Sequence, residues 1–406
     1  MALAGCTSSH EPQAGPRPET LRPTGSDGVL RLGTLLPVTG SLASLGPPQI
    51  DAVHLAVQDV DAAGGVLGHP VQVVDTDSGD VSSDTALRSV DTLLADHVDV
   101  VLGAASSAVT KTVIDKITGA GVVDMSASNT SPDFTQYPDR GLYFRTAPSD
   151  TLQGEVLGDL VVEDGNASVA VLAVQDAYGT GLADAVQRAV DSSNGRVVQK
   201  IVYDRRAPDF AIEVGRVKAA APDAVVLIGF DETARVVTEL VKQGVGPQQG
   251  TRLYLADGAV GQVSLAALPP GTLNGVRATV PGAPLPADFA ARLTALDPQL
   301  QVFSYAAHAY DAVVLLALAA EEARSDAPAA VAAHLPRVSR DGTRCTSFPQ
   351  CKALVDAGTD IDYDGVSGPV DLGPTGDVTQ GTIGVFALGP DGRTAATAER
   401  YRTGAP

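Results

Sequence analysis

The chain has 406 residues, of which 44% are apolar and 19% are charged, and its net charge is −20. This length and composition predict two or three globular domains and exclude a disordered or fibrous protein. The acidic surface disfavours nucleic-acid binding because it repels a phosphate backbone, and the longest uncharged apolar run, residues 312–320, is too short to span a membrane.

From Val29 onward, two series of short apolar strands alternate with amphipathic helices. The first series has predicted strands at residues 29–36, 71–75, 98–102, 122–126 and 142–145, and its first helix ends at Gly64 and Gly65. The second series has strands at residues 168–173, 197–203, 224–228 and 253–255, with helices at 182–190, 210–220 and 233–242, and it ends by residues 277–280. Such alternation is typical of parallel, doubly wound sheets, so we predict two α/β domains.

The last third of the chain reads differently. Helices are predicted at residues 289–296 and 305–323, followed by a loop-rich stretch at 361–376 and a final strand at 382–388. Because these helices bring no strands of their own, they are expected to pack on the first sheet. Ligands of open α/β sheets bind beyond the carboxyl ends of the strands, so two facing sheets would form a binding cleft.

The three cysteines divide into a pair and a single residue. Cys345 and Cys351 lie close together without further metal ligands or a CxxC motif, so a local disulfide and an oxidising compartment are expected. Cys6 ends a Leu-Ala-Gly-Cys sequence that resembles the lipidation motif of bacterial lipoproteins, and residues 7–28 have the composition of a flexible tether. A chance match is the alternative for so short a motif.

An ordered set of short motifs carries a more specific resemblance. The motifs lie at residues 36–46, 61–68, 103–107, 126–132, 144–147, 176–179, 256–258 and 310–312. Over about residues 29–390 this set resembles the leucine/isoleucine/valine-binding protein family, the type 1 periplasmic substrate-binding proteins of ABC transporters, in a lipoprotein member. The resemblance implies two doubly wound lobes joined by a hinge with three crossovers, near residues 146–147, 278–280 and 368–372. Lobe 1 would comprise residues 29–146 and 281–367, lobe 2 residues 147–280 and 368–406, and residues 1–28 the anchor and tether.

Two groups of hydroxyl side chains follow predicted strands of lobe 1. Ser106 and Ser107 open a helix, whose unpaired N–H groups suit a ligand carboxylate, although simple N-capping is the alternative. The resemblance favours binding, because this serine pair matches the family's carboxylate site. Ser128 and Thr130 follow the next strand and are likewise expected to bind ligand, with a plain polar turn as the alternative.

Lobe 2 supplies the expected acidic and aromatic groups. Asp257 follows a strand and is the natural partner of a ligand ammonium, although Asp-Gly is also a common turn. Tyr178 matches a family position that lines the cleft. Asp150 opens a helix after the first crossover and is either a ligand residue or a cap.

Three further residues are expected at the pocket wall. Phe230 and Asp231 follow the strand at residues 224–228. Leu45 stands where several amino-acid binders of the family have an aromatic residue, which changes the shape of the pocket and puts branched-chain specificity in doubt.

Residues 360–371 imitate a calcium-binding loop, with aspartates at positions 360, 362, 364 and 371. The last ligand of such a loop is normally a glutamate and a helix should follow, but Gly368 and Pro369 interrupt that register, so a loop beside the hinge is favoured. No metal or cofactor is expected, and no catalytic motif is present.

These inferences favour a non-enzymatic, extracytoplasmic solute-binding lipoprotein of an ABC importer. It would be a monomer, anchored only through a lipid on Cys6 to the outer face of the cytoplasmic membrane. It would capture a small amino acid or related carboxylate by hinge closure and present it to permease subunits. The alternative is a ligand sensor that presents its bound solute to a membrane receptor.

Overall fold

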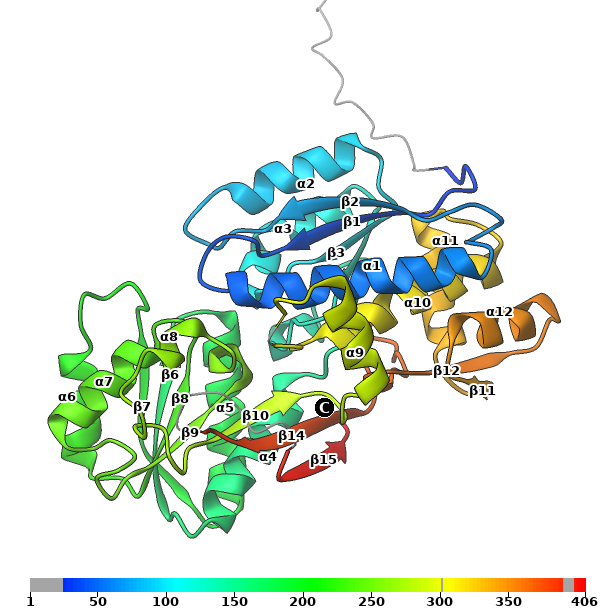
Figure 1. Cartoon of the computed structure of the whole chain (residues 1–406). Helices are drawn as coiled ribbons and strands as arrows, with labels where there is room; N and C mark the ends of the chain where they lie inside the picture. Colours follow the sequence, from blue (N-terminus) through cyan, green and yellow to red (C-terminus); the bar gives the residue numbers. More distant parts are fainter. Residues whose placement is uncertain (1–24, 301, 390–397) are drawn as a thin grey trace, which may run out of the picture.

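The computed structural model describes residues 25–300, 302–389 and 398–406 (Figure 1). Cys6 and most of the expected tether lie outside the described residues. No helix in the described part of the chain combines the length and the apolar character needed to cross a bilayer.

The first lobe is built on a five-stranded, fully parallel sheet with strand order β2-β1-β3-β4-β5. Its strands are β1 (Arg31–Leu36), β2 (Gln72–Asp77), β3 (Val100–Gly103), β4 (Val123–Ser126) and β5 (Tyr143–Arg145). The elements between them are η1 (Ala43–Leu45), α1 (Gly46–Ala62), α2 (Thr85–Ala95), α3 (Ser107–Gly119) and η2 (Pro132–Phe134). We call everything packed on this sheet lobe 1.

Helices from much later in the sequence complete lobe 1, and the first two of them were predicted to pack there. They are α9 (Ala287–Leu296), α10 (Ala306–Ala323), α11 (Pro328–Val338) and α12 (Phe348–Asp356). The almost entirely buried α10 packs against α1, and residues of both helices share one apolar core with β1, β3 and β4. Figure 1 shows these yellow and orange helices beside the blue α1.

Lobe 2 is built on a seven-stranded sheet with strand order β15-β14-β10-β9-β8-β6-β7. Its strands are β6 (Ser168–Val174), β7 (Arg196–Tyr203), β8 (Ala224–Ile228), β9 (Arg252–Leu255), β10 (Arg277–Pro281), β14 (Gly381–Ala387) and β15 (Arg400–Gly404). The strands from β6 to β10 are parallel, whereas β14 and β15 are antiparallel additions at one edge. Its helices are α4 (Asp150–Glu163), α5 (Ala177–Ser192), α6 (Ala211–Ala220), α7 (Thr233–Gln243), η3 (Asp257–Ala259) and α8 (Val263–Ala266). The interior strand β8 is wholly apolar and buried, which is typical of a parallel strand covered on both faces.

Two glycines let α4 and α5 approach each other closely. A Cβ atom on Gly154 or Gly158 would lie 2.3 or 2.5 Å from the Cβ of Ala185 or Ala189 on α5. Only small residues permit such an approach, so side chains at the start of α4 come within reach of those at the start of α5. This packing positions polar groups of the candidate site described below.

Some elements were not predicted. The stretch expected to be loop-rich contains β12 (Ile361–Gly365) and β13 (Gly368–Pro369), which form a small sheet with β11 (Thr343–Cys345). Helices α11 and α12 and strand β15 were also missed. The expected residue boundaries of the lobes stay a prediction.

The Cys345–Cys351 disulfide is present, with a Cα–Cα distance of 5.3 Å, so the predicted pairing is confirmed. Both cysteines are fully buried in the core of lobe 1. Replacing both with Ala is expected to lower the free energy of unfolding by about 2 kcal/mol, because the bond closes a short loop. Ligand affinity should be unchanged in calorimetric titration, and a loss of binding would move the site toward this segment.

Candidate ligand-binding site

A cleft that opens to solvent lies between the lobes, and two of the site residues predicted from the sequence, Ser106 and Phe230, line it. Lobe 1 contributes residues from the loops after β1, β2 and β3, and lobe 2 contributes residues after β6, β7 and β8; they include Ser41, Asp80, Ser106, Asp176, Arg205 and Phe230. The cleft therefore lies beyond the carboxyl ends of parallel strands in both sheets, where open α/β sheets bind ligands.

The serine pair at the start of α3 divides into a cap and a candidate binding group. The Ser106 side chain is the N-cap and accepts a hydrogen bond from the Val109 N–H at 3.4 Å. Ser107 is buried, and its hydroxyl oxygen accepts from the Ser131 N–H at 3.4 Å. Because that hydroxyl acts as an acceptor there, its own proton stays available to a ligand.

The loop after β4 is fixed by hydrogen bonds to its neighbours. Asn129 is wholly buried and donates to the carbonyls of Ala104 and Ala105 at 2.8 and 3.1 Å, so its role is structural. Ser128 donates to the buried Gln49 side chain at 3.0 Å. The Thr130 carbonyl accepts from the Asp150 N–H at 2.7 Å, which ties this loop of lobe 1 to the start of α4.

Asp150 is a buried acid without a partner. The N-cap of α4 is Ser149, not Asp150, so the alternative role as a cap is not needed. Asp150 is fully buried, and among the described residues neither of its carboxylate oxygens has a hydrogen-bond partner. Burial and the nearby charge of Asp257 raise the pKa of Asp150 well above its usual range. The Thr130 side chain lies near enough to oppose that rise as a weak donor, although it forms no hydrogen bond of ordinary geometry with the carboxylate.

Asp257, in contrast, is well supplied with donors. Its Oδ1 accepts from the Gln153 side-chain amide at 2.8 Å and from the Tyr178 hydroxyl at 2.9 Å, and its Oδ2 accepts from the Tyr305 hydroxyl at 2.5 Å. Burial raises the pKa of this carboxyl, and the three donors oppose the rise. The two acids thus lie close together. Both oxygens of Asp257 accept hydrogen bonds from protein donors, whereas those of Asp150 do not.

The two predicted aromatic residues pack against each other, whereas one predicted acid is exposed. Tyr178 and Phe230 are buried and stack with their ring centroids 5.3 Å apart. Asp231 is exposed and is not brought to this set. The adjacent Glu232 is the buried acid there, and it accepts from the Tyr203 hydroxyl at 2.8 Å and from the Phe230 N–H at 3.1 Å.

The segment just before α1 makes direct contacts across the cleft. Leu42 and Leu45 are buried in the apolar cluster of lobe 2, although they follow β1 of lobe 1. Arg205 of lobe 2 donates to the Ser41 hydroxyl and lies 3.2 Å from Asp80. Leu45 is therefore an interlobe packing residue next to the candidate site.

Sequence reasoning missed Gln49, Gln153 and Tyr305, all buried beside the candidate residues. Gln153 lies three residues after Asp150 on α4, so the two side chains share one helix face. Its amide oxygen is also buried without a hydrogen-bond partner among the described residues. The spacing of Asp150 and Gln153 could therefore have indicated Gln153 from the sequence. Tyr305, in contrast, belongs to no motif and lies far from Asp257 in the sequence.

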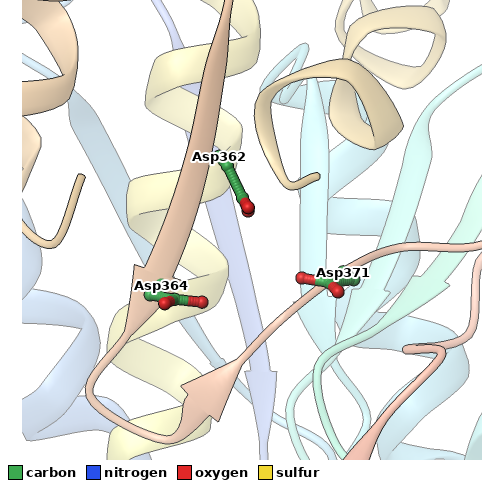
Figure 2. Close-up of side chains that lie close together, drawn as sticks. All are labelled: Asp362, Asp364 and Asp371. Carbon is green, nitrogen blue, oxygen red and sulfur yellow. The ribbon is translucent and has the colours of Figure 1, made fainter. Parts of the chain in front are cut away.

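The calcium-like segment also brings its acids together. One carboxylate oxygen each from Asp362, Asp364 and Asp371 lies within 4.8 Å of the others, and Figure 2 shows these side chains on β12 and on the segment after β13. Asp364 is already ion-paired with Arg344. Strand β13 lies within this segment, and strand β14, not the second helix of a calcium loop, is the next element after it, so we assign no metal to it.

Comparisons with known proteins agree with this architecture. The model of the periplasmic binding protein family matches residues 29–392. The "Chemotactic signal transduction system substrate-binding protein BasB" of Halobacterium salinarum is 30% identical over 354 residues, which is 84% of this chain and 83% of that protein.

Two solved structures show the same fold. The branched-chain amino acid transporter substrate-binding protein LivJ of Streptococcus pneumoniae, in complex with isoleucine, has a TM-score of 0.73 at 21% identity and covers 93% of this chain and 100% of its own. A solute-binding protein of R. palustris in complex with 4-hydroxybenzoate has a TM-score of 0.76 at 16% identity and covers 93% and 98%. The predicted two-lobed fold and family resemblance are confirmed, and the family implies an extracytoplasmic location. With a family model that matches most of its length and a bilobal cleft, the chain belongs to the periplasmic binding proteins.

Proposed function

We propose that this solute-binding protein captures a small amino acid between its lobes and delivers it to an ABC permease. The observation that carries the ligand class is the buried, unpartnered carboxylate of Asp150. A buried charge without a partner is costly, so a cation supplied by the ligand would stabilise it strongly.

Three buried acceptor atoms on one face of α4 have no hydrogen-bond partner among the described residues and could bind this cation. They are the two carboxylate oxygens of Asp150 and the amide oxygen of Gln153. An ammonium group has three N–H donors, which matches this number. Asp257 adds a second negative charge beside them, since its charge raises the pKa of Asp150.

The ligand carboxylate would bind in lobe 1. Ser107 has a hydroxyl proton free to donate, and it is the first residue of α3, whose N-terminus carries a partial positive charge. Thr130 is buried and joined to Asp150 through its carbonyl, so the two ligand charges would be bound on adjacent loops.

The same acids argue against a simple carboxylate as the ligand. A 4-hydroxybenzoate, as in the R. palustris protein, has no cation for Asp150. Arg145 also influences the pKa of Asp150, but its guanidinium is held by Asp377. An anionic ligand would therefore enter a site that already holds two acids and no free cation among the described residues.

The partners follow from this role. We propose a monomer without enzymatic activity that docks on permease subunits and is held at the membrane through a lipid on Cys6. The relatives that match over most of this chain are solute-binding proteins, which supports the non-enzymatic part. The proposed hinge crossings are those near residues 146–147, 278–280 and 368–372.

One relative favours a second role. BasB is named as part of a chemotactic signal transduction system, so a sensor that presents its ligand to a membrane receptor is the second candidate. Uptake of labelled ligand should fall in cells that lack this chain if it serves a permease. Unchanged uptake with a lost behavioural response would support the sensor.

Thermal unfolding with candidate ligands tests the ligand class. Small L-amino acids are expected to raise the melting temperature, because a ligand that binds only the folded state stabilises it by mass action. Matched acids without the amino group, such as 4-methylpentanoate beside leucine, should have no effect at equal concentration. Equal stabilisation by both members of a pair would contradict an ammonium site at Asp150.

A further inference from the structure

The carboxylate of Asp257 receives hydrogen bonds from both lobes. Two donors, Gln153 and Tyr178, belong to lobe 2, like Asp257 itself. The third is the Tyr305 hydroxyl, 2.5 Å from Oδ2. Tyr305 directly precedes α10, which packs on α1 in the core of lobe 1. This bond therefore crosses between the lobes inside the candidate ligand site.

The backbone at Tyr305 is in an uncommon conformation. Its φ is +61°, in the left-handed region, although Tyr is not a residue that adopts this region readily. The residue is nevertheless buried, and its ring lies next to that of His308, with centroids 5.6 Å apart. Surrounding structure holds this conformation, which aims the hydroxyl at the lobe 2 carboxylate.

We propose that Tyr305 is a positioning residue that couples ligand binding in lobe 2 to closure of lobe 1. The inference rests on the proposed ammonium site. A cation bound between Asp150 and Asp257 keeps the second carboxylate negatively charged, and a charged acceptor makes the stronger hydrogen bond. Since the Tyr305 hydroxyl reaches that acceptor only when the lobes are together, the bound ligand favours the closed arrangement.

Several polar contacts between side chains across the cleft lack this property. Arg205 contacts Ser41 and Asp80, and Ser44 donates to Gln262 at 3.2 Å. None of these groups bonds to Asp150 or Asp257 among the described residues. They stabilise the closed arrangement whether or not a cation is present, whereas the Tyr305 bond responds to the charge state of the ligand site.

The test compares three tyrosine variants for ligand affinity by calorimetry and for closure by the radius of gyration in solution scattering. Y305F is expected to lower amino-acid affinity about tenfold and to leave a larger radius of gyration at saturating ligand than the wild type has. Y178F removes a donor to the same carboxylate from within lobe 2, so it should weaken binding but close fully at saturation.

Y310F is the matched control, because Tyr310 lies on α10, the helix that Tyr305 directly precedes. The Tyr310 hydroxyl donates to Asp59 at 2.6 Å within lobe 1, so its loss should change neither affinity nor closure. A Y305F protein that binds and closes like the wild type would overturn the coupling while the ligand assignment stands. Absence of amino-acid binding by the wild type would instead contradict the proposed function itself.

Discussion

Replacing Asp150 with Asn is expected to weaken amino-acid binding at least thirtyfold. The substitution keeps the shape of the side chain but removes the charge that would pair with the ligand ammonium. Truncating one partner of a buried, hydrogen-bonded charge pair typically costs about 2–5 kcal/mol, and 2 kcal/mol corresponds to about thirtyfold. Isothermal titration with the best ligand from the thermal screen measures this loss directly.

Two variants make this result specific. D231N removes an exposed acid of the same lobe and should bind like the wild type. S107A removes one hydroxyl but leaves the N–H groups of α3, so its cost should be nearer 1–2 kcal/mol. The folded protein should also gain stability in D150N, because the unpartnered buried carboxylate is gone. Wild-type affinity in D150N would show that the ligand cation, if there is one, binds elsewhere.

The regular elements were predictable because their patterns are local. The strand at residues 224–228 is an apolar run that matches β8 from end to end, and helices α7 and α10 differ from their predicted bounds by one residue. The short strand β11 is neither apolar nor alternating, and β12 and β13 lie in a stretch rich in Gly, Pro and Asp. Their pairing depends on tertiary contacts, above all on Asp311 of α10, which accepts from the Tyr363 hydroxyl at 2.8 Å and from the Ser367 N–H at 2.7 Å.

The candidate site shows the same division between local and distant signals. Ser107, Thr130 and Asp257 follow strands, so the rule for open sheets places them at one cleft. Which acid lacks a partner could not be predicted, because the donors to Asp257 come from α4, α5 and the start of α10. The sequence favoured Asp257 for the ligand cation, whereas the hydrogen bonds now favour Asp150 with Asp257 beside it.

Replacing Asp377 with Asn is expected to lower the free energy of unfolding by about 3–5 kcal/mol. Arg145 has a fully buried side chain and binds Asp377 through two N–H groups, Nε at 2.6 Å and Nη2 at 2.9 Å. Removing one partner of a buried ion pair leaves the other charge uncompensated, which is the costly case. Asp377 lies between β13 and β14, where the chain passes from the small sheet of lobe 1 to the sheet of lobe 2, so the pair also fixes this passage to the end of β5.

The matched control is an exposed ion pair of similar length. Lys200 lies 2.6 Å from Asp184, with side chains 35% and 56% exposed, so D184N should cost at most about 1 kcal/mol. Urea unfolding of both variants, monitored with one spectroscopic probe in each lobe, gives the comparison.

The Arg145 guanidinium also donates to the carbonyls of Asn129 and Ser131, at 3.2 and 2.8 Å, on either side of Thr130. D377N should therefore weaken ligand binding as well, because an arginine released from Asp377 no longer holds the Thr130 loop in place. Equal stability and equal ligand affinity in D377N and D184N would show that the Arg145–Asp377 pair fixes neither this passage of the chain nor the loop.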